Sequence, residues 1–302
     1  MTDLTGRAEI AASMAEALHR LGRNDAALGH ALEALAELGF QFPRGARAIR
    51  LAIGARLAGR ASRQLLRPVR APADAAYTVA ARLFEVVGAI DYFLDPPRFV
   101  LGILTMLEEA EKRPLSRALA VSTASLGLIF DTLGQHRLGA LMHRRAMRQA
   151  RELGDDLTLG YCNHLLGLHQ YGSGKWTSAL STLAIGSAQL ERAGHLRYLA
   201  SCMGANYFVL RSMGDPRWLD LAELQQQVAT AANDEHAIAW AVNAAGVAHL
   251  YRGDHMAARP LFERASIAYE AIPDYRFLSG ACARRALCHA LEGEVDAAME
   301  LL

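Results

Sequence analysis

Small and apolar residues recur at helical spacing along most of the chain. After Gly253 come Ala258, Phe262 and Ala265, and a similar run of small and bulky residues follows Gly174. Steps of three and four residues place such side chains on one face of a helix. The pattern therefore predicts a series of helices, each with one face that must be buried.

Five glycines mark helix–helix turns at almost constant intervals. They are Gly134, Gly174, Gly214, Gly253 and Gly293, and they lie 40, 40, 39 and 40 residues apart. Glycine adopts positive φ at no steric cost, so it can end the first helix of a pair. Repeats of this kind bury their apolar faces only by stacking on their neighbours. The sequence therefore predicts an all-α fold, an α-solenoid of antiparallel helix pairs.

A second small residue precedes most of these turns by seven positions. Gly127, Gly167 and Gly246 hold this position in three repeats, whereas Tyr207 breaks the pattern before Gly214. Antiparallel helices need small side chains where their backbones approach most closely, and a bulky side chain fills the space one turn further along. The positions that we expect to hold the helix pairs together are Gly127, Gly134, Gly167, Gly174, Gly214, Gly246, Gly253, Ala258, Phe262, Ala265 and Gly293.

This arrangement resembles the tetratricopeptide repeat, which has a small residue at position 8, Gly at 15, Ala at 20, an aromatic residue at 24 and Ala at 27. Gly246, Gly253, Ala258, Phe262 and Ala265 match these positions in order. The period of about 40, rather than the usual 34, is similar to that of long-helix repeats in bacterial ATPase-linked signalling and transcription regulators. The resemblance implies a right-handed superhelix of about 14 or 15 helices.

The regularity of the repeat divides the sequence into two parts. We expect residues 1–72 to form a degenerate helical repeat and an Arg-rich helical segment, and residues 73–302 to form the regular array. Near its start, Asp95 as N-cap and Pro96 as first helical residue replace the glycine turn. The last repeat stops within its second helix. We therefore expect a truncated repeat that self-associates or contacts another polypeptide through exposed apolar side chains.

The segment 43–70 contains eight arginines and no acidic residue. A basic patch of this kind can bind nucleic acid, lipid or an acidic protein surface. The same residues can instead form a solvated helix face with salt bridges to acidic residues such as Glu108, Glu109 and Glu111. Aromatic residues for base stacking are missing from the segment, so we favour the second interpretation.

Composition and charge exclude several classes of protein. The net charge is +1 and 52% of the residues are hydrophobic, so global charge indicates no partner and the chain has enough apolar side chains for a large core. The four cysteines have no spacing typical of a disulfide framework. The sequence has no apolar signal core at its start and no uncharged apolar stretch of about 18 residues. We expect a cytoplasmic protein without a membrane partner.

The sequence predicts no catalytic residue, no cofactor and no metal site. The motif GSGKW at 172–176 lacks the spacing of a phosphate loop, because Trp176 stands where a hydroxyl residue would bind the metal. Cys162, His164 and His169 are potential zinc ligands, but their spacings differ from the i, i+3 or i+4 pair typical of a helical metal site. The sequence contains neither a nucleophile elbow nor an HExxH helix.

In a tetratricopeptide superhelix, the first helix of each pair lines the concave groove, and the resemblance implies the same here. The candidate groove residues are Tyr161, His164, Tyr171, Phe208, Arg211, Trp240, Asn243 and Tyr251. Aromatic and apolar side chains with a few polar groups suit an extended or helical peptide. The alternative is that these side chains pack between neighbouring helices.

We therefore predict a non-catalytic protein that binds a protein or peptide, as a scaffold or sensor module of a bacterial regulatory or signalling system. An ATPase, cyclase, kinase or DNA-binding module encoded nearby is the expected partner. Two alternatives remain open. One is an enzyme with a pocket between helices, and the other is a basic module that contacts nucleic acid through residues 43–70.

Overall fold

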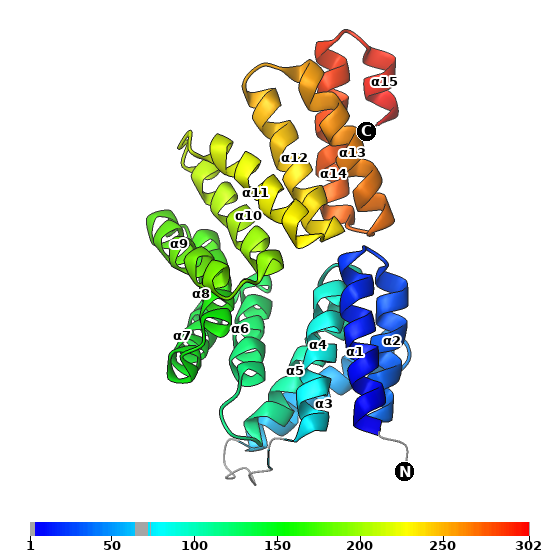
Figure 1. Ribbon diagram of the computed structural model, residues 1–302, viewed down its shortest axis with the longest axis vertical. Helices are drawn as coiled ribbons and strands as arrows, with labels where there is room; N and C mark the ends of the chain where they lie inside the picture. The colour runs from blue at the N-terminus through cyan, green and yellow to red at the C-terminus, as the bar shows by residue number, and fades with distance from the viewer. Residues whose placement is uncertain (1–3, 64–71, 73, 302) are drawn as a thin grey trace. The chain divides into compact units, whose positions relative to one another are not determined.

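The computed structural model describes residues 4–63, 72 and 74–301. Within these residues the chain forms fifteen α-helices and no strand (Figure 1), which confirms the all-α prediction. The helices are α1 (Leu4–Arg20), α2 (Asn24–Glu37), α3 (Ala46–Arg63), α4 (Ala75–Leu94), α5 (Pro96–Glu111), α6 (Arg117–Thr132), α7 (His136–Leu153), α8 (Asp156–Gly172), α9 (Trp176–Arg192), α10 (Leu196–Ser212), α11 (Trp218–Ala232), α12 (Glu235–Tyr251), α13 (His255–Ala271), α14 (Tyr275–Leu291) and α15 (Val295–Glu300).

Short turns that contain glycine join the helices of the five pairs from α6–α7 to α14–α15. The five predicted turn glycines follow α6, α8, α10, α12 and α14, and their φ angles lie between 68° and 82°. Each of them therefore ends the first helix of a pair in the left-handed conformation that favours glycine. The predicted 40-residue period is thus the period of the helix pairs.

Close packing within a pair follows the predicted small-and-bulky pattern. In the pair α12–α13, a Cβ atom at Gly246 would lie 2.8 Å from Phe262 Cε1. Phe262 and Ala258 are both fully buried. In the pair α6–α7 the bulky position holds a histidine, since a Cβ atom at Gly127 would lie 2.8 Å from His143 Nε2. Glycine seven residues before the turn, at Gly127 and Gly246, therefore allows a ring of the second helix to lie directly on the backbone of the first helix.

The pair α10–α11 achieves its close contact in another way. Tyr207 is buried against Trp218, with ring centroids 5.6 Å apart. The closest approach occurs instead at Gly204, where a Cβ atom would lie 2.8 Å from Gln225 Nε2. Gln225 Nε2 donates a hydrogen bond of 3.2 Å to the carbonyl oxygen of Ala200. The break in the sequence pattern at Tyr207 thus marks a shift of the small contact residue by three positions, about one helical turn.

The helices form two compact units. The first unit contains the chain up to Lys175 except Arg20–Gly22, and the second contains Arg20–Gly22 and Trp176–Leu302. Each has its own buried core, which includes Leu107 in the first unit and Tyr269 in the second. Among the described helices, none is both long and apolar enough to cross a lipid bilayer.

The Arg-rich segment forms α3 as far as the structure describes it, and residues 64–70 lie outside the described residues. Arg56 forms an ion pair with Glu108 on α5, and Glu111 on the same helix pairs with Arg145. The acidic partners named from the sequence are therefore engaged, one of them by the segment itself. This agrees with a solvated, partly salt-bridged helix face. The proposed division of the repeat types near residue 72 stays a prediction.

Candidate functional site

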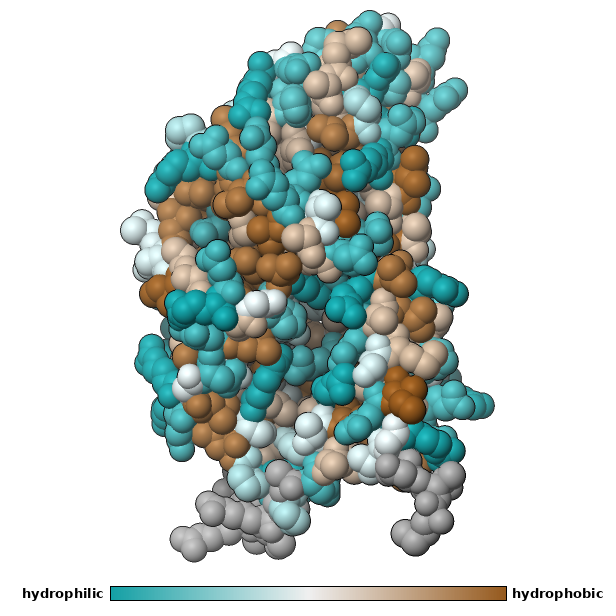
Figure 2. All heavy atoms as spheres, viewed as in Figure 1, coloured by the Kyte–Doolittle hydropathy of each residue, from teal (hydrophilic) through white to brown (hydrophobic). Residues whose placement is uncertain are grey.

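Large apolar side chains are exposed on many different helices rather than on one. Examples are Ile10, Leu51, Ile185, Met256 and Ile267. On the visible face of the molecule, hydrophobic and hydrophilic residues are interleaved (Figure 2). Scattered exposed apolar residues are normal for a protein surface. A candidate site must therefore be identified from side chains that converge. Among the described residues we consider two such groups, one in each unit.

Three aromatic side chains from three first helices form a row in the second unit. Phe277 of α14 contacts both Phe208 of α10 and Trp240 of α12, with ring centroids 6.3 Å and 5.9 Å apart. All three side chains are half-buried, so part of each ring is accessible to solvent. We call Phe208, Trp240 and Phe277 the aromatic row. Rigid, half-exposed rings of this kind are typical anchors for a peptide side chain.

A buried carboxylate holds the aromatic row in place. Asp274 is 1% exposed, and its Oδ2 lies 2.7 Å from His236 Nε2 and accepts a hydrogen bond of 3.2 Å from Trp240 Nε1. Its Oδ1 accepts a hydrogen bond of 3.3 Å from the backbone N–H of Phe277 and so caps α14. The indole of Trp240 also lies against the His236 ring, with centroids 4.2 Å apart. One carboxylate therefore orients two members of the row.

Two arginines accompany the row on the same first helices. Arg211 follows Phe208 by three residues on α10 and Arg284 follows Phe277 by seven on α14, spacings that keep both near the face of the row. Burial lowers the pKa of Arg284, and the charge of Arg211 lowers it further. Within the described residues, no carboxylate lies at ion-pair distance from either guanidinium group. Two partly buried cations without a counterion favour a ligand that carries a negative group.

The remaining predicted groove residues lie elsewhere. Tyr161, His164 and Tyr171 are on α8 in the first unit, where His164 is buried and the two tyrosines are half-buried. Tyr251 ends α12, is 72% exposed, and stands edge-on to Trp218 with ring centroids 5.2 Å apart. The structure thus brings together only part of the set that the repeat positions suggested.

Two members of the site, Phe277 and Arg284, were missed by the sequence analysis. Both lie on α14, whose groove positions were not assigned. The sequence did contain a signal for the start of α14, because Asp274 follows Asp234 by 40 residues. Each of these two residues caps the first helix of a pair. Asn243 was predicted to line the groove, but it is 7% exposed, and its Oδ1 is buried with no hydrogen-bond partner in the described part of the chain. It therefore lies beneath the surface rather than on it.

Cys162, His164 and His169 do not converge, although they are close in sequence. The thiol of Cys162 lies 4.0 Å from the carbonyl oxygen of Ala120, and His164 Nδ1 has no hydrogen-bond partner among the described residues. His169 points instead at Asp131. The motif GSGKW likewise forms an ordinary helix–helix turn rather than a phosphate loop.

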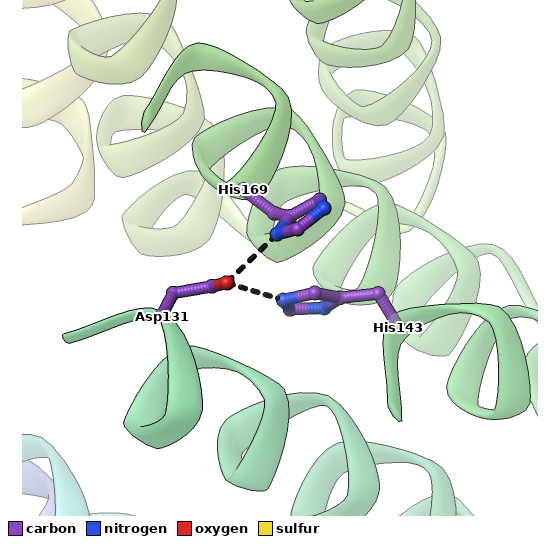
Figure 3. Close-up of side chains that lie close together, drawn as sticks. All are labelled: Asp131, His143 and His169. Carbon is purple, nitrogen blue, oxygen red and sulfur yellow. Dashed lines mark hydrogen bonds and ion pairs between the residues drawn. The ribbon is translucent and has the colours of Figure 1, made fainter. Parts of the chain in front are cut away.

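Asp131, His143 and His169 form the second convergent group, in the first unit (Figure 3). Asp131 Oδ2 is 2.9 Å from His143 Nε2, and Asp131 Oδ1 is 2.8 Å from His169 Nδ1. Burial raises the pKa of Asp131, but the hydrogen bonds and positive charge of the two histidines lower it by more, so the net shift is downward. The carboxyl group is therefore ionised at neutral pH.

The pH dependence of stability should report the burial of His164. Burial lowers the pKa of His164 to about 4 from its ordinary value of 6.5. The unfolded chain binds this proton below pH 6.5, whereas the folded chain resists it, so stability is full above pH 6.5 and is lost as the pH falls to about 4. Between pH 7 and pH 4.5, His164 alone should lower the free energy of unfolding by about 2–3 kcal/mol.

Urea unfolding at these two pH values, on the wild type and on His164→Leu, measures this contribution. When the pH falls from 7 to 4.5, His164→Leu should lose about 2–3 kcal/mol less stability than the wild type, because leucine does not titrate. Leu165→Ala, which changes a buried side chain on the same helix without removing a titratable group, should keep the wild-type dependence. The interpretation fails if His164→Leu and the wild type respond equally to pH.

A scan of protein-family models and a comparison with curated proteins return no match to this chain. Its fold is similar to those of solved tetratricopeptide-repeat structures. A Rap protein complexed with competence and sporulation factor superposes with a TM-score of 0.61 at 13% identity, covering 98% of this chain and 74% of that chain. The apo form of RapI superposes with a TM-score of 0.52 at 12% identity, covering 97% and 74%.

A third similar structure is a signal transduction ATPase with numerous domains from Pyrococcus horikoshii, which has a tetratricopeptide-repeat sensor. It superposes with a TM-score of 0.56 at 13% identity, covering 91% of this chain but 42% of that chain. At such identities the likeness concerns the fold alone. It confirms the predicted α-solenoid of the tetratricopeptide type.

Proposed function

We propose that this chain is a protein-interaction module that binds a peptide or a partner segment along the aromatic row, as a scaffold or sensor in a bacterial regulatory system. The fold supports this proposal, because helical repeat proteins bind their partners along the surface of their stacked helices. The similar structures include a Rap protein complexed with a factor and an ATPase with a repeat sensor. In this role the chain itself is not an enzyme.

The observation that carries the proposal is the combination of the aromatic row with two arginines that have no carboxylate at ion-pair distance among the described residues. The half-exposed rings of Phe208, Trp240 and Phe277 offer apolar contact at a fixed position, since Asp274 orients two of them. Guanidinium groups form charge-assisted, bidentate hydrogen bonds with carboxylates. The expected ligand therefore combines an apolar or aromatic side chain with a carboxylate.

A displayed library of random peptides, selected on the wild-type chain, tests this proposal. The enriched peptides should combine an apolar or aromatic residue with Asp, Glu or a free C-terminal carboxylate. Phe277→Ala and Arg284→Gln should each weaken the binding of a selected peptide at least tenfold, about 1.4 kcal/mol, as measured by fluorescence anisotropy.

The matched control is the neighbouring residue Arg285. Its guanidinium pairs with Glu263 on α13 at 2.9 Å, so Arg285→Gln should leave peptide binding within about twofold of the wild type. Selected peptides that bind Phe277→Ala and Arg284→Gln as tightly as the wild type would show that the aromatic row is not the binding surface.

A further inference from the structure

Asp131, His143 and His169 come from three different helices and meet inside the first unit (Figure 3). Asp131 lies in the last turn of α6, His143 lies on α7, and His169 lies in the last turn of α8. One carboxylate oxygen and one imidazole nitrogen from each histidine lie within 4.8 Å of one another. We call these three residues the Asp–His–His cluster.

The repeat fold does not require this chemistry. The position of His143 is held in the pair α12–α13 by Phe262, which packs on its partner helix in the same way. The position of Asp131, three residues before the turn glycine, holds Tyr171 and Arg211 in the next two repeats. An aromatic ring at the position of His143 is sufficient for packing. The next two repeats have no carboxylate at the position of Asp131. The cluster is therefore specific to one repeat.

Two glycines create the space that the cluster occupies. A Cβ atom at Gly127 would lie 2.8 Å from His143 Nε2, and one at Gly139 would overlap the carboxylate of Asp131. His143 is 1% exposed and His169 is 8% exposed. A negative carboxylate flanked by two imidazoles, largely excluded from water, attracts a cation far more strongly than the same groups would at the surface.

We propose that the Asp–His–His cluster binds a divalent transition-metal ion, with Zn²⁺ as the preferred class. Two imidazole nitrogens and one carboxylate oxygen are donors that suit Zn²⁺ and its first-row neighbours, whereas Mg²⁺ and Ca²⁺ prefer oxygen ligands. Bonds of about 2.0–2.2 Å in tetrahedral geometry would place the donor atoms about 3.3 Å apart. In the structure, the three donor atoms lie within 4.8 Å of one another.

The fourth ligand of the ion would be a water molecule. His136, at the start of α7, has its Nδ1 3.4 Å from Asp131 Oδ1, but it does not belong to the group whose donor atoms all lie within 4.8 Å of one another. The free nitrogen of His143, Nδ1, is buried without a hydrogen-bond partner among the described residues. Because an unsupported histidine ligand lowers affinity by about 10–100-fold, we expect a dissociation constant in the micromolar range.

Metal binding at this point would connect three consecutive helices. Since the ligands come from α6, α7 and α8, the ion binds the folded unit and not the unfolded chain, and it raises stability by mass action. The inference is independent of the aromatic row, which lies in the other unit. The ion would act on the first unit as a structural link between repeats.

The test is a titration of the full chain, first freed of metal with EDTA, with ZnCl₂, CoCl₂ and MgCl₂. We expect Zn²⁺ to bind with a stoichiometry of one by calorimetry and to raise the Tm by about 5 °C at a concentration 100 times the dissociation constant. Co²⁺ should bind with visible absorption typical of a tetrahedral site. Mg²⁺ should leave the Tm unchanged.

Two variants that preserve the fold make the test specific. His143→Phe supplies the aromatic ring that Phe262 provides in the pair α12–α13, and His169→Gln keeps a hydrogen-bond donor near Asp131. Each should lower Zn²⁺ affinity at least tenfold. The control is His236→Asn, which removes a histidine from the buried His–Asp pair of the second unit and should bind Zn²⁺ like the wild type. If Zn²⁺ has no effect on the wild type, or if both ligand variants bind Zn²⁺ as tightly as the wild type, then the cluster is only a hydrogen-bonded contact.

Discussion

Replacing Phe262 with alanine should lower the free energy of unfolding by about 3–5 kcal/mol. The ring is fully buried between α12 and α13, where it lies directly on the backbone of Gly246. Truncation removes the apolar contact and leaves a cavity beside a glycine that has no side chain to fill it. Urea unfolding followed by circular dichroism measures the change.

The matched control lies on the same helix. Met256 is 60% exposed at the start of α13, so Met256→Ala should change the free energy of unfolding by no more than about 0.5 kcal/mol. If Phe262→Ala unfolds at the same urea concentration as Met256→Ala, then Phe262 is not the side chain that fills the α12–α13 contact.

Asp274→Ala should cost a similar amount, about 3–5 kcal/mol, because it removes one partner of a buried polar network. The carboxylate is bonded to His236, Trp240 and the backbone N–H of Phe277, and it is 1% exposed. Its loss removes a buried hydrogen-bond partner from the imidazole of His236 and from the indole N–H of Trp240, and it uncaps α14. Urea unfolding gives the cost. A change in tryptophan fluorescence, to which Trp240 contributes together with Trp176 and Trp218, reports the loss of order in the aromatic row.

The variant Asp254→Ala measures how much free energy of unfolding is lost when a helix cap alone is removed. Asp254 caps α13 by accepting a hydrogen bond of 3.1 Å from the N–H of Ala257, but it is exposed, and the Nδ1 of its other partner, His249, lies 3.4 Å away on a side chain that is 38% exposed. Asp254→Ala should therefore cost only about 1 kcal/mol. An equal cost for Asp254→Ala and Asp274→Ala would mean that the buried network contributes nothing beyond the cap.

The aromatic row contains some, but not all, of the groove residues predicted from the sequence, and that these residues bind a ligand stays a prediction. Phe208, Arg211 and Trp240 were predicted because the resemblance to tetratricopeptide repeats places them on first helices, and the structure brings Phe208 and Trp240 together through Phe277. Tyr161 was predicted by the same rule but lies in the other unit. Position within a repeat identifies a face of a helix, whereas the neighbours of that face depend on how helices stack.

The helix pairs, their period and their turns were determined by the sequence itself, because they depend on residues that are close along the chain. Gly134 has a φ of 71° and ends α6, and Asp95 accepts the hydrogen bond from the N–H of Arg98 that caps α5. Small residues before the turn and bulky residues after it determine how the two helices of a pair contact each other. These are local effects of backbone conformation and helical periodicity.

Convergence of side chains from separate helices was decided only by the tertiary structure. Asp131, His143 and His169 are separated by 12 and 26 residues, and no helical spacing relates all three. They meet because Gly127 and Gly139 let the side chains of His143 and Asp131 approach the neighbouring backbone, and because α8 stacks against α6. A change of about 1 Å in helix packing would move the side chains of Asp131, His143 and His169 apart without altering any helix. The sequence pattern alone therefore does not predict this contact.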